Sequence, residues 1–445
     1  MNRVRESATH LSWGRAIRAH HKIFEPIDRH SALAAFEAAK KEGVTVLGYG
    51  LGRSYGDSNL NPNEMLFASR SLDHFIALDL ETGLIRAEAG VSLAEVLEIA
   101  VPRGFFLPTT PGSQFVTLAG ALANDVHGKN HHRAGCFGNA VTRFGMVRSD
   151  RGEIEVSSKS HSDLFAATIG GLGLTGLITW VEFQLTPIES AYISEETLVF
   201  NNADEFFEIE ETHRNRFEYT VSWIDCTTQG KKLGRGIFSG GNWSSTGGLD
   251  VNRPGGPILP FDLPSFALNP LTLKAFNATY FAHQKIKPRE RSSHYSGFFY
   301  PLDSIRGWNR LYGRKGFFQF QSVIPMKHAR EATKEMLALV AASGQGSMLA
   351  VLKTFGSKSS PGLMSFPREG VTLALDFKNS GQRTLALMAQ LDAIVKNADG
   401  RLYPAKDGRI SAEMFQSGYP EWVNVERLRD PLISSAFWRR VTRSE

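Results

Sequence analysis

Short runs of apolar and polar positions divide the first 190 residues into alternating strand and helix patterns. Ser31 can cap a helix in which Leu33, Phe36 and Ala39 share one face. Ser92 precedes a second helical pattern that ends at Ala100. The remaining elements predicted in this part are a helix at 162–168 and strands at 44–47, within 65–90, at 141–148, 153–157 and 177–185.

From about residue 190 the pattern changes, and aromatic residues and longer strands predominate. Strands are predicted at 317–325, 347–356 and 371–377, with helices at about 327–342 and 381–397. This β-β-α order predicts an antiparallel sheet covered by helices.

Residues 241–295 are rich in Gly, Pro and Phe and show little periodicity. A segment of this kind predicts a long irregular stretch, either a mobile lid or a loop packed on its own domain. Its apolar content is also suited to contact with lipid.

A length of 445 residues exceeds what a single core usually supports and predicts two domains. The net charge of +5 is mild and scattered, so no nucleic-acid partner is expected. Two cysteines, Cys136 and Cys226, make no disulfide framework and favour a reducing, cytoplasmic location. No uncharged run approaches the length of a membrane span.

Glycine-rich segments occur three times among the predicted elements of the first part: 48–59, 111–139 and 170–176. The first reads GYGLGRSYGDSN, which matches neither the dinucleotide fingerprint nor the Walker pattern and disfavours a Rossmann domain. Glycine allows backbone to approach a ligand closely, so the three segments predict an extended ligand contacted along its length. The alternative is a set of tight loops packed on their neighbours.

The segment 111–139 also carries three histidines, His127, His131 and His132. The spacing of His127 and His131 would suit a metal on one helix face. No carboxylate or cysteine lies at a recognised ligand spacing, however, and no metal is expected. Reactive side chains at one end of a ligand cradle are the favoured interpretation.

Seven sequence motifs, in this order along nearly the whole chain, are together specific: GLGRSYGD (50–57), the PG…HGKNHH…FGN frame (111–139), GG.GLTG (170–176), FYPLD (299–303), GFFQFQ.VIP (316–325), SFP (365–367) and RLYPAKD (401–407). The chain resembles the vanillyl-alcohol-oxidase (PCMH-type) family of FAD oxidoreductases. Within that family it is most similar to oxidases of polyprenyl-phosphoryl pentoses.

The resemblance implies an α+β, two-domain PCMH-type FAD-binding fold with an inserted substrate domain, which is built on an antiparallel sheet covered by helices. The FAD-binding domain would span residues 1–189 in two subdomains, and the substrate domain 190–400, with a mobile loop at 241–295. Residues 401–445 would return to the FAD-binding domain.

The resemblance also implies the residues that hold FAD: Gly50, Leu51, Gly52, Arg53, Ser54, Tyr55, Gly56, Gly112, Thr117, Gly120, Asn124, His127, Ile178, Tyr403 and Lys406. Several relatives attach the flavin covalently through a histidine in the early glycine-rich loop. Here that loop reads Arg53-Ser54-Tyr55, so we expect non-covalent FAD.

Lys406, His127 and Tyr55 are the expected catalytic residues. A cation at the flavin ring favours hydride transfer, and a histidine or tyrosine can exchange the hydroxyl proton. The expected substrate residues are Tyr300, Gln319, Gln321, Lys353 and Phe355. Thr372 and Ala374 depart from the side chains of the resembled pocket, an asparagine and a cysteine.

The expected reaction is FAD-dependent oxidation of the 2′-hydroxyl of a polyprenyl-phosphoryl-β-D-ribose to the 2-keto sugar, the first half of an epimerisation to the arabinose form. A separate NAD(P)H-dependent short-chain reductase would complete it, and peripheral membrane contact would give access to the lipid. The alternatives are an alditol or aldose oxidase of the same fold, acting on a soluble sugar, and a flavin-free structural subunit.

Overall fold

The computed structural model describes residues 3–251, 256–264 and 266–442. Its first sheet has the order β1-β2-β4-β3. The strands β1 (Arg3–Leu11) and β2 (Arg18–Glu25) are antiparallel, whereas β2, β4 (Met65–Ala68) and β3 (Val46–Tyr49) run parallel. Helix α1 (Ala32–Glu42) packs on this sheet through Ala35, Phe36 and Ala39, close to the predicted face.

The second sheet is antiparallel and has the order β5-β6-β10-β8-β9. Its strands are β5 (Phe75–Leu78), β6 (Leu84–Glu88), β10 (Leu177–Gln184), β8 (Val141–Arg148) and β9 (Gly152–Ser157). The helices of this region are α2 (Leu93–Ala100), α3 (Leu118–Ala123), α4 (His131–Ala134) and α5 (Ser162–Thr168). Ser92 and Glu95 form a capping box at the start of α2, because each side chain accepts a backbone N–H of the other.

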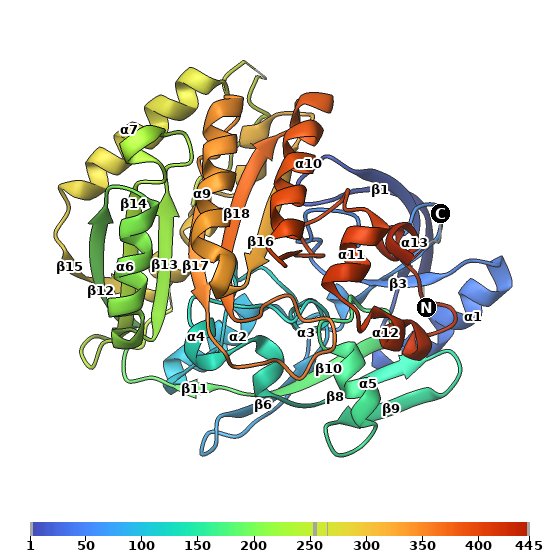
Figure 1. Ribbon diagram of the computed structural model, residues 1–445. Helices are drawn as coiled ribbons and strands as arrows, with labels where there is room; N and C mark the ends of the chain where they lie inside the picture. Colours follow the sequence, from blue (N-terminus) through green and yellow to red (C-terminus); the bar gives the residue numbers. More distant parts are fainter. Residues whose placement is uncertain (1–2, 252–255, 265, 443–445) are drawn as a thin grey trace.

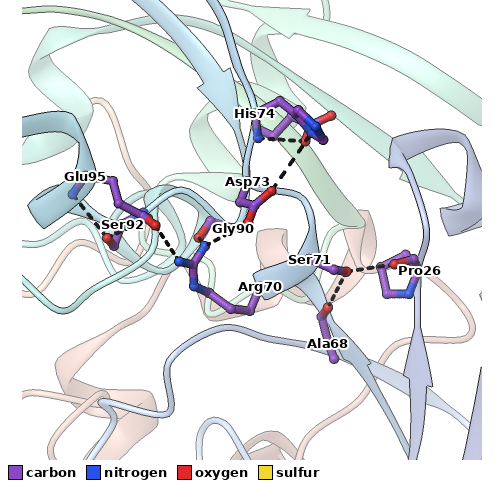
Figure 2. A network of polar contacts seen from close by, with 10 residues as sticks. Pro26, Ala68, Arg70, Ser71, Asp73, His74, Gly90, Ser92 and Glu95 are labelled. Carbon is purple, nitrogen blue, oxygen red and sulfur yellow. Dashed lines mark hydrogen bonds and ion pairs between the residues drawn. The ribbon is translucent and has the colours of Figure 1, made fainter. Parts of the chain in front are cut away.

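Arg70, just after β4, ties the first sheet to the second (Figure 2). Its guanidinium donates to the carbonyl oxygen of Gly90 at 3.0 Å and pairs with the Glu95 carboxylate of the capping box. The neighbouring Ser71 hydroxyl donates to the carbonyl oxygen of Pro26 at 2.7 Å. The turn that follows β4 is therefore held both to the residue after β2 and to the start of α2.

An eight-stranded antiparallel sheet forms the other half of the molecule, in the order β15-β12-β14-β13-β17-β18-β16-β19. Its strands are β15 (Glu290–His294), β12 (Tyr192–Phe200), β14 (Gly236–Trp243), β13 (Tyr219–Ile224), β17 (Ala350–Phe355), β18 (Gly370–Lys378), β16 (Phe317–Ile324) and β19 (Arg401–Leu402). Helices α6 (Ala203–His213), α9 (Met326–Ser343) and α10 (Gln382–Asn397) cover one face (Figure 1). The predicted antiparallel sheet covered by helices and the α+β class are confirmed.

Strand alternation separates the two faces of this sheet. On β18, Leu373 and Leu375 are fully buried in the main hydrophobic core. Thr372, Ala374 and Asp376, the alternate residues, line a cavity on the face opposite the helices. The uncovered face of the sheet is therefore the wall of a binding site.

The C-terminal segment returns to the N-terminal part of the molecule. Helices α11 (Ala412–Gly418) and α13 (Ala436–Thr442) lie side by side, and α12 (Trp422–Leu428) lies against α5 beside the second sheet (Figure 1). The Val46 N–H donates to the carbonyl oxygen of Leu432 at 2.7 Å. Arg440 pairs with Asp57 at 2.7 Å and with Asp407 at 3.3 Å, so one guanidinium joins the early glycine-rich loop to the C-terminal segment.

The structure corrects the prediction that 241–295 is irregular, although residues 252–255 and 265 lie outside the described part. This segment contains the 16-residue helix α7 (Pro270–Lys285) and strand β15, and α8 (Tyr295–Phe299) follows. Asn269 caps α7 with Thr272, but only Asn277 and Phe281 are buried along it. A helix with so few buried positions lacks the amphipathic repeat by which helices are predicted from sequence. Among the described residues, no helix has both the length and the apolar character needed to cross a membrane.

Candidate active site

A cavity of about 1040 Å³ lies between the glycine-rich segments and the uncovered face of the eight-stranded sheet. Ligand sites typically measure roughly 300–1,000 Å³, so this one suits a large ligand. All but one of the residues expected to hold FAD line it: Gly50, Leu51, Gly52, Arg53, Ser54, Tyr55, Gly112, Thr117, Gly120, Asn124, His127, Ile178, Tyr403 and Lys406.

Gly56 is the expected residue that does not line the cavity. A Cβ at Gly56 would lie 1.5 Å from the carbonyl oxygen of Asp407. The absence of a side chain at Gly56 therefore lets the C-terminal segment pack closely. A side chain at Gly50 would also clash, because its Cβ would lie 2.4 Å from the Thr117 hydroxyl that caps α3.

Gly112 and a group of unpaired polar side chains test whether the cavity fits a polar ligand. A Cβ at Gly112 would meet no protein atom within 4 Å, and its φ is ordinary, so the protein itself does not require glycine there. Ser58, Asn59 and His127 line the cavity and carry buried polar atoms that have no hydrogen-bond partner among the described residues. Open space beside unpaired donors and acceptors fits a bound group that carries both.

His127 is buried at the centre of an aromatic cluster. Its ring lies 4.9 Å from that of Phe355, 5.6 Å from Phe366 and 5.4 Å from Tyr403. Burial, followed by the charge of Lys353, lowers the pKa of His127 well below its ordinary value. The imidazole is therefore neutral at physiological pH. Nε2 lies 3.3 Å from the amide nitrogen of Gln321, and Nδ1 has no partner.

His131 and His132 do not line the cavity. The His131 ring lies 4.5 Å from that of Phe355, and His132 Nε2 bonds to the carbonyl oxygen of Phe217 at 3.0 Å. In the described ranges, no three His, Cys, Asp or Glu side chains form a group that could hold a metal ion.

Two lysines line the cavity, of which Lys353 is buried and Lys129 is partly exposed. Lys353 Nζ donates to the carbonyl oxygen of Gly128 at 2.6 Å, and burial lowers its pKa to about 7. Lys129 donates to the carbonyl oxygen of Phe298 and lies 4.2 Å from the centroid of that ring, and burial lowers its pKa to about 8. Each ammonium group keeps N–H donors beyond the bond described, as an anionic ligand requires.

Lys406 and Tyr55 come from opposite ends of the chain and meet in the cavity. Lys406 Nζ lies 3.7 Å from the centroid of the Tyr55 ring. Burial lowers the pKa of Lys406 to about 7, while the charge of Asp376 opposes this effect. Burial also raises the pKa of the Tyr55 hydroxyl well above its ordinary value. The pair therefore offers a ligand the ammonium group of Lys406 and the protonated hydroxyl of Tyr55.

Asp376 is a cavity residue that sequence reasoning missed. Its carboxylate accepts a hydrogen bond from Gln319 Nε2 at 2.6 Å and lies 3.4 Å from the Tyr312 hydroxyl. Burial raises its pKa to about 7. A single acidic residue in the apolar run VTLALDF was the available signal. Gln319 lines the cavity as expected, but its amide is committed to Asp376.

Tyr300 and Phe355 are expected substrate residues that do not line the cavity. The Tyr300 hydroxyl lies 2.7 Å from the Thr110 hydroxyl in a buried contact. Its neighbours Phe298 and Phe299 line the cavity instead. Phe355 is fully buried and supports the His127 ring and the Lys353 ammonium group. Gln321 and Lys353 do line the cavity.

Comparison with known proteins agrees with this geometry. A family model described as an FAD-binding domain matches residues 22–158. The chain is 34% identical over 439 residues to decaprenylphosphoryl-beta-D-ribose oxidase of Mycolicibacterium smegmatis, a match that covers 95% of this chain and 94% of the relative. The chain belongs to the decaprenylphosphoryl-ribose oxidase family. It is an FAD oxidoreductase of the PCMH type, and FAD is its cofactor.

More distant relatives match a smaller share of this oxidase. An uncharacterized protein of Streptomyces coelicolor is 28% identical over 352 residues, which cover 76% of this oxidase and 95% of the relative. A D-lactate dehydrogenase of Anaerostipes hadrus is 26% identical over 136 residues, 29% of this oxidase and 28% of the relative. The match to decaprenylphosphoryl-beta-D-ribose oxidase covers nearly the whole chain, whereas the match to the D-lactate dehydrogenase covers less than a third of it.

Thr372 and Ala374, the two departures from the resembled pocket, both line the cavity of this oxidase. Thr372 lies 3.3 Å from the amide nitrogen of Gln321, so its hydroxyl takes part in holding that side chain. The described cysteines Cys136 and Cys226 are buried and do not line the cavity. No thiol of the described residues therefore faces a ligand there.

Proposed function

We propose that the enzyme oxidises the 2′-hydroxyl of a polyprenyl-phosphoryl-β-D-ribose to the 2-keto sugar. The observation that carries this proposal is the part of the cavity that α7 and the strands β13, β14 and β17 line. Many of its side chains are apolar or aromatic, and they stand beside the polar Glu195, Ser239 and Arg291. The apolar and aromatic ones are Val221, Trp223, Ile237, Phe276, Tyr280, Met348, Leu349 and Val351. A prenyl chain needs such a chamber, whereas a soluble alditol or aldose needs a closed polar pocket.

Oxidation of a secondary alcohol removes a hydride from the carbon and a proton from its hydroxyl. Bound FAD supplies the hydride acceptor. We assign Lys406 as the cation that stabilises negative charge at the acceptor, because it is buried at the expected FAD end of the cavity. The backbone of Gly50–Tyr55 and the unpaired side chains of Ser58 and Asn59 would hold the cofactor.

We assign His127 as the proton acceptor. Its lowered pKa keeps the ring unprotonated at neutral pH. Nε2 lies against the amide of Gln321, which leaves Nδ1 as the ring nitrogen that has no partner among the described residues and would face the ligand. Tyr55 is protonated over the whole physiological range because burial raises its pKa, so it serves as a donor.

Lys129 and Lys353 are proposed to bind the phosphate that links sugar and lipid. Both line the cavity, and among the described residues neither forms an ion pair within 4.0 Å. A phosphate there would satisfy the remaining N–H donors of both groups. Its negative charge would also raise the pKa of both ammonium groups.

The 2-keto product needs a hydride donor to become the arabinose epimer. We propose that a separate NAD(P)H-dependent short-chain reductase supplies this second step. Peripheral membrane contact is proposed to deliver the lipid, on the basis of the strongly exposed apolar side chains Phe266, Leu271 and Ile286 on and beside α7.

Anaerobic mixing of the FAD-loaded enzyme with farnesyl-phosphoryl-β-D-ribose tests the function. We expect loss of the oxidised flavin absorbance and a keto sugar by mass spectrometry, while ribose 5-phosphate and xylitol react at least tenfold more slowly. Trp223→Ala should raise KM for the farnesyl substrate, and Thr279→Ala is the control, because Thr279 is exposed on α7 and does not line the cavity. Faster reaction with xylitol would instead support the alditol oxidase.

A further inference from the structure

We propose that Asp125 is a positioning residue that fixes the ring of His127 at the cavity wall. Asp125 follows α3 and is fully buried, and it does not itself line the cavity. Its role in the reaction rests on the assignment of His127 under the proposed function. The contacts that hold the ring do not depend on which substrate is bound.

The Asp125 carboxylate binds two separate segments of the chain. Its Oδ1 accepts a hydrogen bond from the backbone N–H of Gly138 at 2.7 Å. Its Oδ2 accepts from the hydroxyls of Ser360 and Ser365, whose oxygens lie 2.8 Å apart. A buried polar network that is satisfied in this way makes the surrounding chain rigid.

The first of these segments forms the turn that carries His127 itself. His127 pairs with Cys136 as an isolated antiparallel bridge, and the bond from Gly138 to Asp125 closes the turn at the end of this pairing. A Cβ at Gly138 would lie 2.8 Å from Oδ1, so a side chain there would disturb the bond. Asp125 has a φ of 39°, in the left-handed region that residues other than glycine rarely adopt. The backbone at His127 is therefore tied to the carboxylate.

The second segment is the loop 356–368, which joins β17 to β18 and carries Phe366. Ser365, one of the two serines bound to the carboxylate, directly precedes Phe366. The Phe366 ring stacks on that of Tyr403 with centroids 4.5 Å apart, and its centroid lies 5.6 Å from that of His127. The carboxylate thus also holds the aromatic side chain against which the imidazole packs.

The His127 ring has few polar contacts of its own. Nε2 lies 3.3 Å from the amide nitrogen of Gln321, and Nδ1 has no partner among the described residues. The charged and titratable groups that act on the ring are Lys353, His131 and Lys406, and all three act through their charge. The orientation of the imidazole therefore depends on its backbone and on the rings around it.

The hydrogen bonds of Asp125 do not require a charged carboxylate. Burial raises the pKa of Asp125, and the bonds from Ser360, Ser365 and Gly138 lower it again. In the protonated state, Oδ2 would donate to one serine hydroxyl, and Oδ1 would still accept the N–H of Gly138.

Nuclear magnetic resonance of the FAD-loaded enzyme with ¹⁵N-labelled histidine tests the inference without substrate. The variants are Asp125→Asn and Ser365→Ala, and Ser357→Ala, an exposed serine of the same loop, is the matched control. Loss of signals in His127→Gln assigns the ring. A fixed neutral ring carries its proton on one nitrogen, so we expect well-separated nitrogen shifts in the wild type and in Ser357→Ala. In the other two variants the shifts should converge, because a ring that turns exchanges between tautomers.

An unchanged separation in both Asp125→Asn and Ser365→Ala would overturn the proposal, as would averaged shifts in the wild type. Ser365→Ala keeps the bonds from Ser360 and Gly138, so it remains informative if Asp125→Asn does not fold.

A double-mutant cycle on the rate of flavin reduction by the farnesyl substrate tests the link to catalysis. We expect Asp125→Asn to lower this rate about tenfold with little change in KM, because a displaced base affects the reaction step and not binding. In the His127→Gln background, Asp125→Asn should have no further effect. An equal loss in both backgrounds would show a purely structural role. If the substrate does not reduce the wild type, the proposed substrate is wrong, whereas the nitrogen shifts still decide whether Asp125 fixes the ring.

Discussion

The ammonium group of Lys406 lies over the ring of Tyr55, 3.7 Å from its centroid, although 351 positions separate the two residues in the sequence. The contact joins the early glycine-rich loop to the C-terminal segment at the wall of the cavity. A cation over an aromatic face, away from water, keeps a defined position.

Lys406→Met should slow substrate-dependent reduction of the flavin by about 10²–10³-fold, because loss of one preorganised charge at a developing anion has this order of effect. FAD content and Tm should change little. Stopped-flow absorbance with the farnesyl substrate measures the rate, and the exposed Lys231→Met is the control. An unchanged rate would remove Lys406 from the reaction.

Gly112→Ala should weaken FAD binding about tenfold or more without lowering the Tm of the flavin-free protein. The added Cβ would enter open space next to the cavity and meet no protein atom within 4 Å. Fluorescence titration of the flavin-free protein with FAD gives the dissociation constant. Equal affinity in both proteins would show that no part of the cofactor approaches Gly112.

Gly56→Ala should have the opposite effect and lower the Tm of the flavin-free protein. Its Cβ would lie 1.5 Å from the Asp407 carbonyl oxygen, so the C-terminal segment would have to shift. Overpacking of this kind costs about 1–3 kcal/mol. Thermal melts of the two glycine variants side by side make the comparison, and a stable Gly56→Ala protein would contradict it.

Glu210→Gln should stabilise the protein increasingly as pH rises from about 4.5 to 7. Neither carboxylate oxygen of Glu210 has a hydrogen-bond partner within the described residues, and burial raises its pKa from 4.5 to about 7. When an acidic group has a higher pKa in the folded than in the unfolded protein, the protein loses stability as pH rises from the unfolded to the folded pKa. The gain above pH 7 should approach about 3 kcal/mol.

Thermal unfolding of Glu210→Gln at pH 4.5 and pH 8 measures this pH dependence. The exposed neighbour Glu211→Gln on the same helix is the control and should follow the wild type at both values. A difference from the wild type that stays constant with pH would show that ionisation of Glu210 does not set its cost.

Acid precipitation of the holoenzyme should release FAD into the supernatant and leave a colourless pellet. Arg53, Ser54 and Tyr55 occupy the loop in which several relatives have an attaching histidine, and none of the three is a histidine. The absorbance of supernatant and pellet decides the outcome. A yellow pellet would show a covalent bond.

Local signals in the sequence determined much of the fold. Ser92 and Glu95 lie three residues apart and form the capping box of α2, and the strand period of 371–377 places Thr372, Ala374 and Asp376 on one face. These features depend on neighbours within one turn or one strand. The glycine-rich motifs likewise predicted a cofactor cradle, and the residues expected to form it line the cavity except for Gly56.

Long-range contacts were decided only by the tertiary structure. Helix α7 carries few buried positions, so its period is weak, and its place beside the cavity depends on the sheet opposite it. The commitment of Gln319 to Asp376 and the placement of Tyr300 behind the cavity wall depend on side chains from distant strands and loops.

The sequence by itself determined the local elements, the family and most of the cofactor cradle, because short motifs encode turns, caps and strand faces. Which ionisable side chains come together in the cavity was decided only by the tertiary structure. Lys406, Asp376 and Tyr55 come from three separate segments, and burial at their junction changes the pKa of each. Desolvation depends on everything that surrounds a group in space, and no short stretch of sequence contains that information.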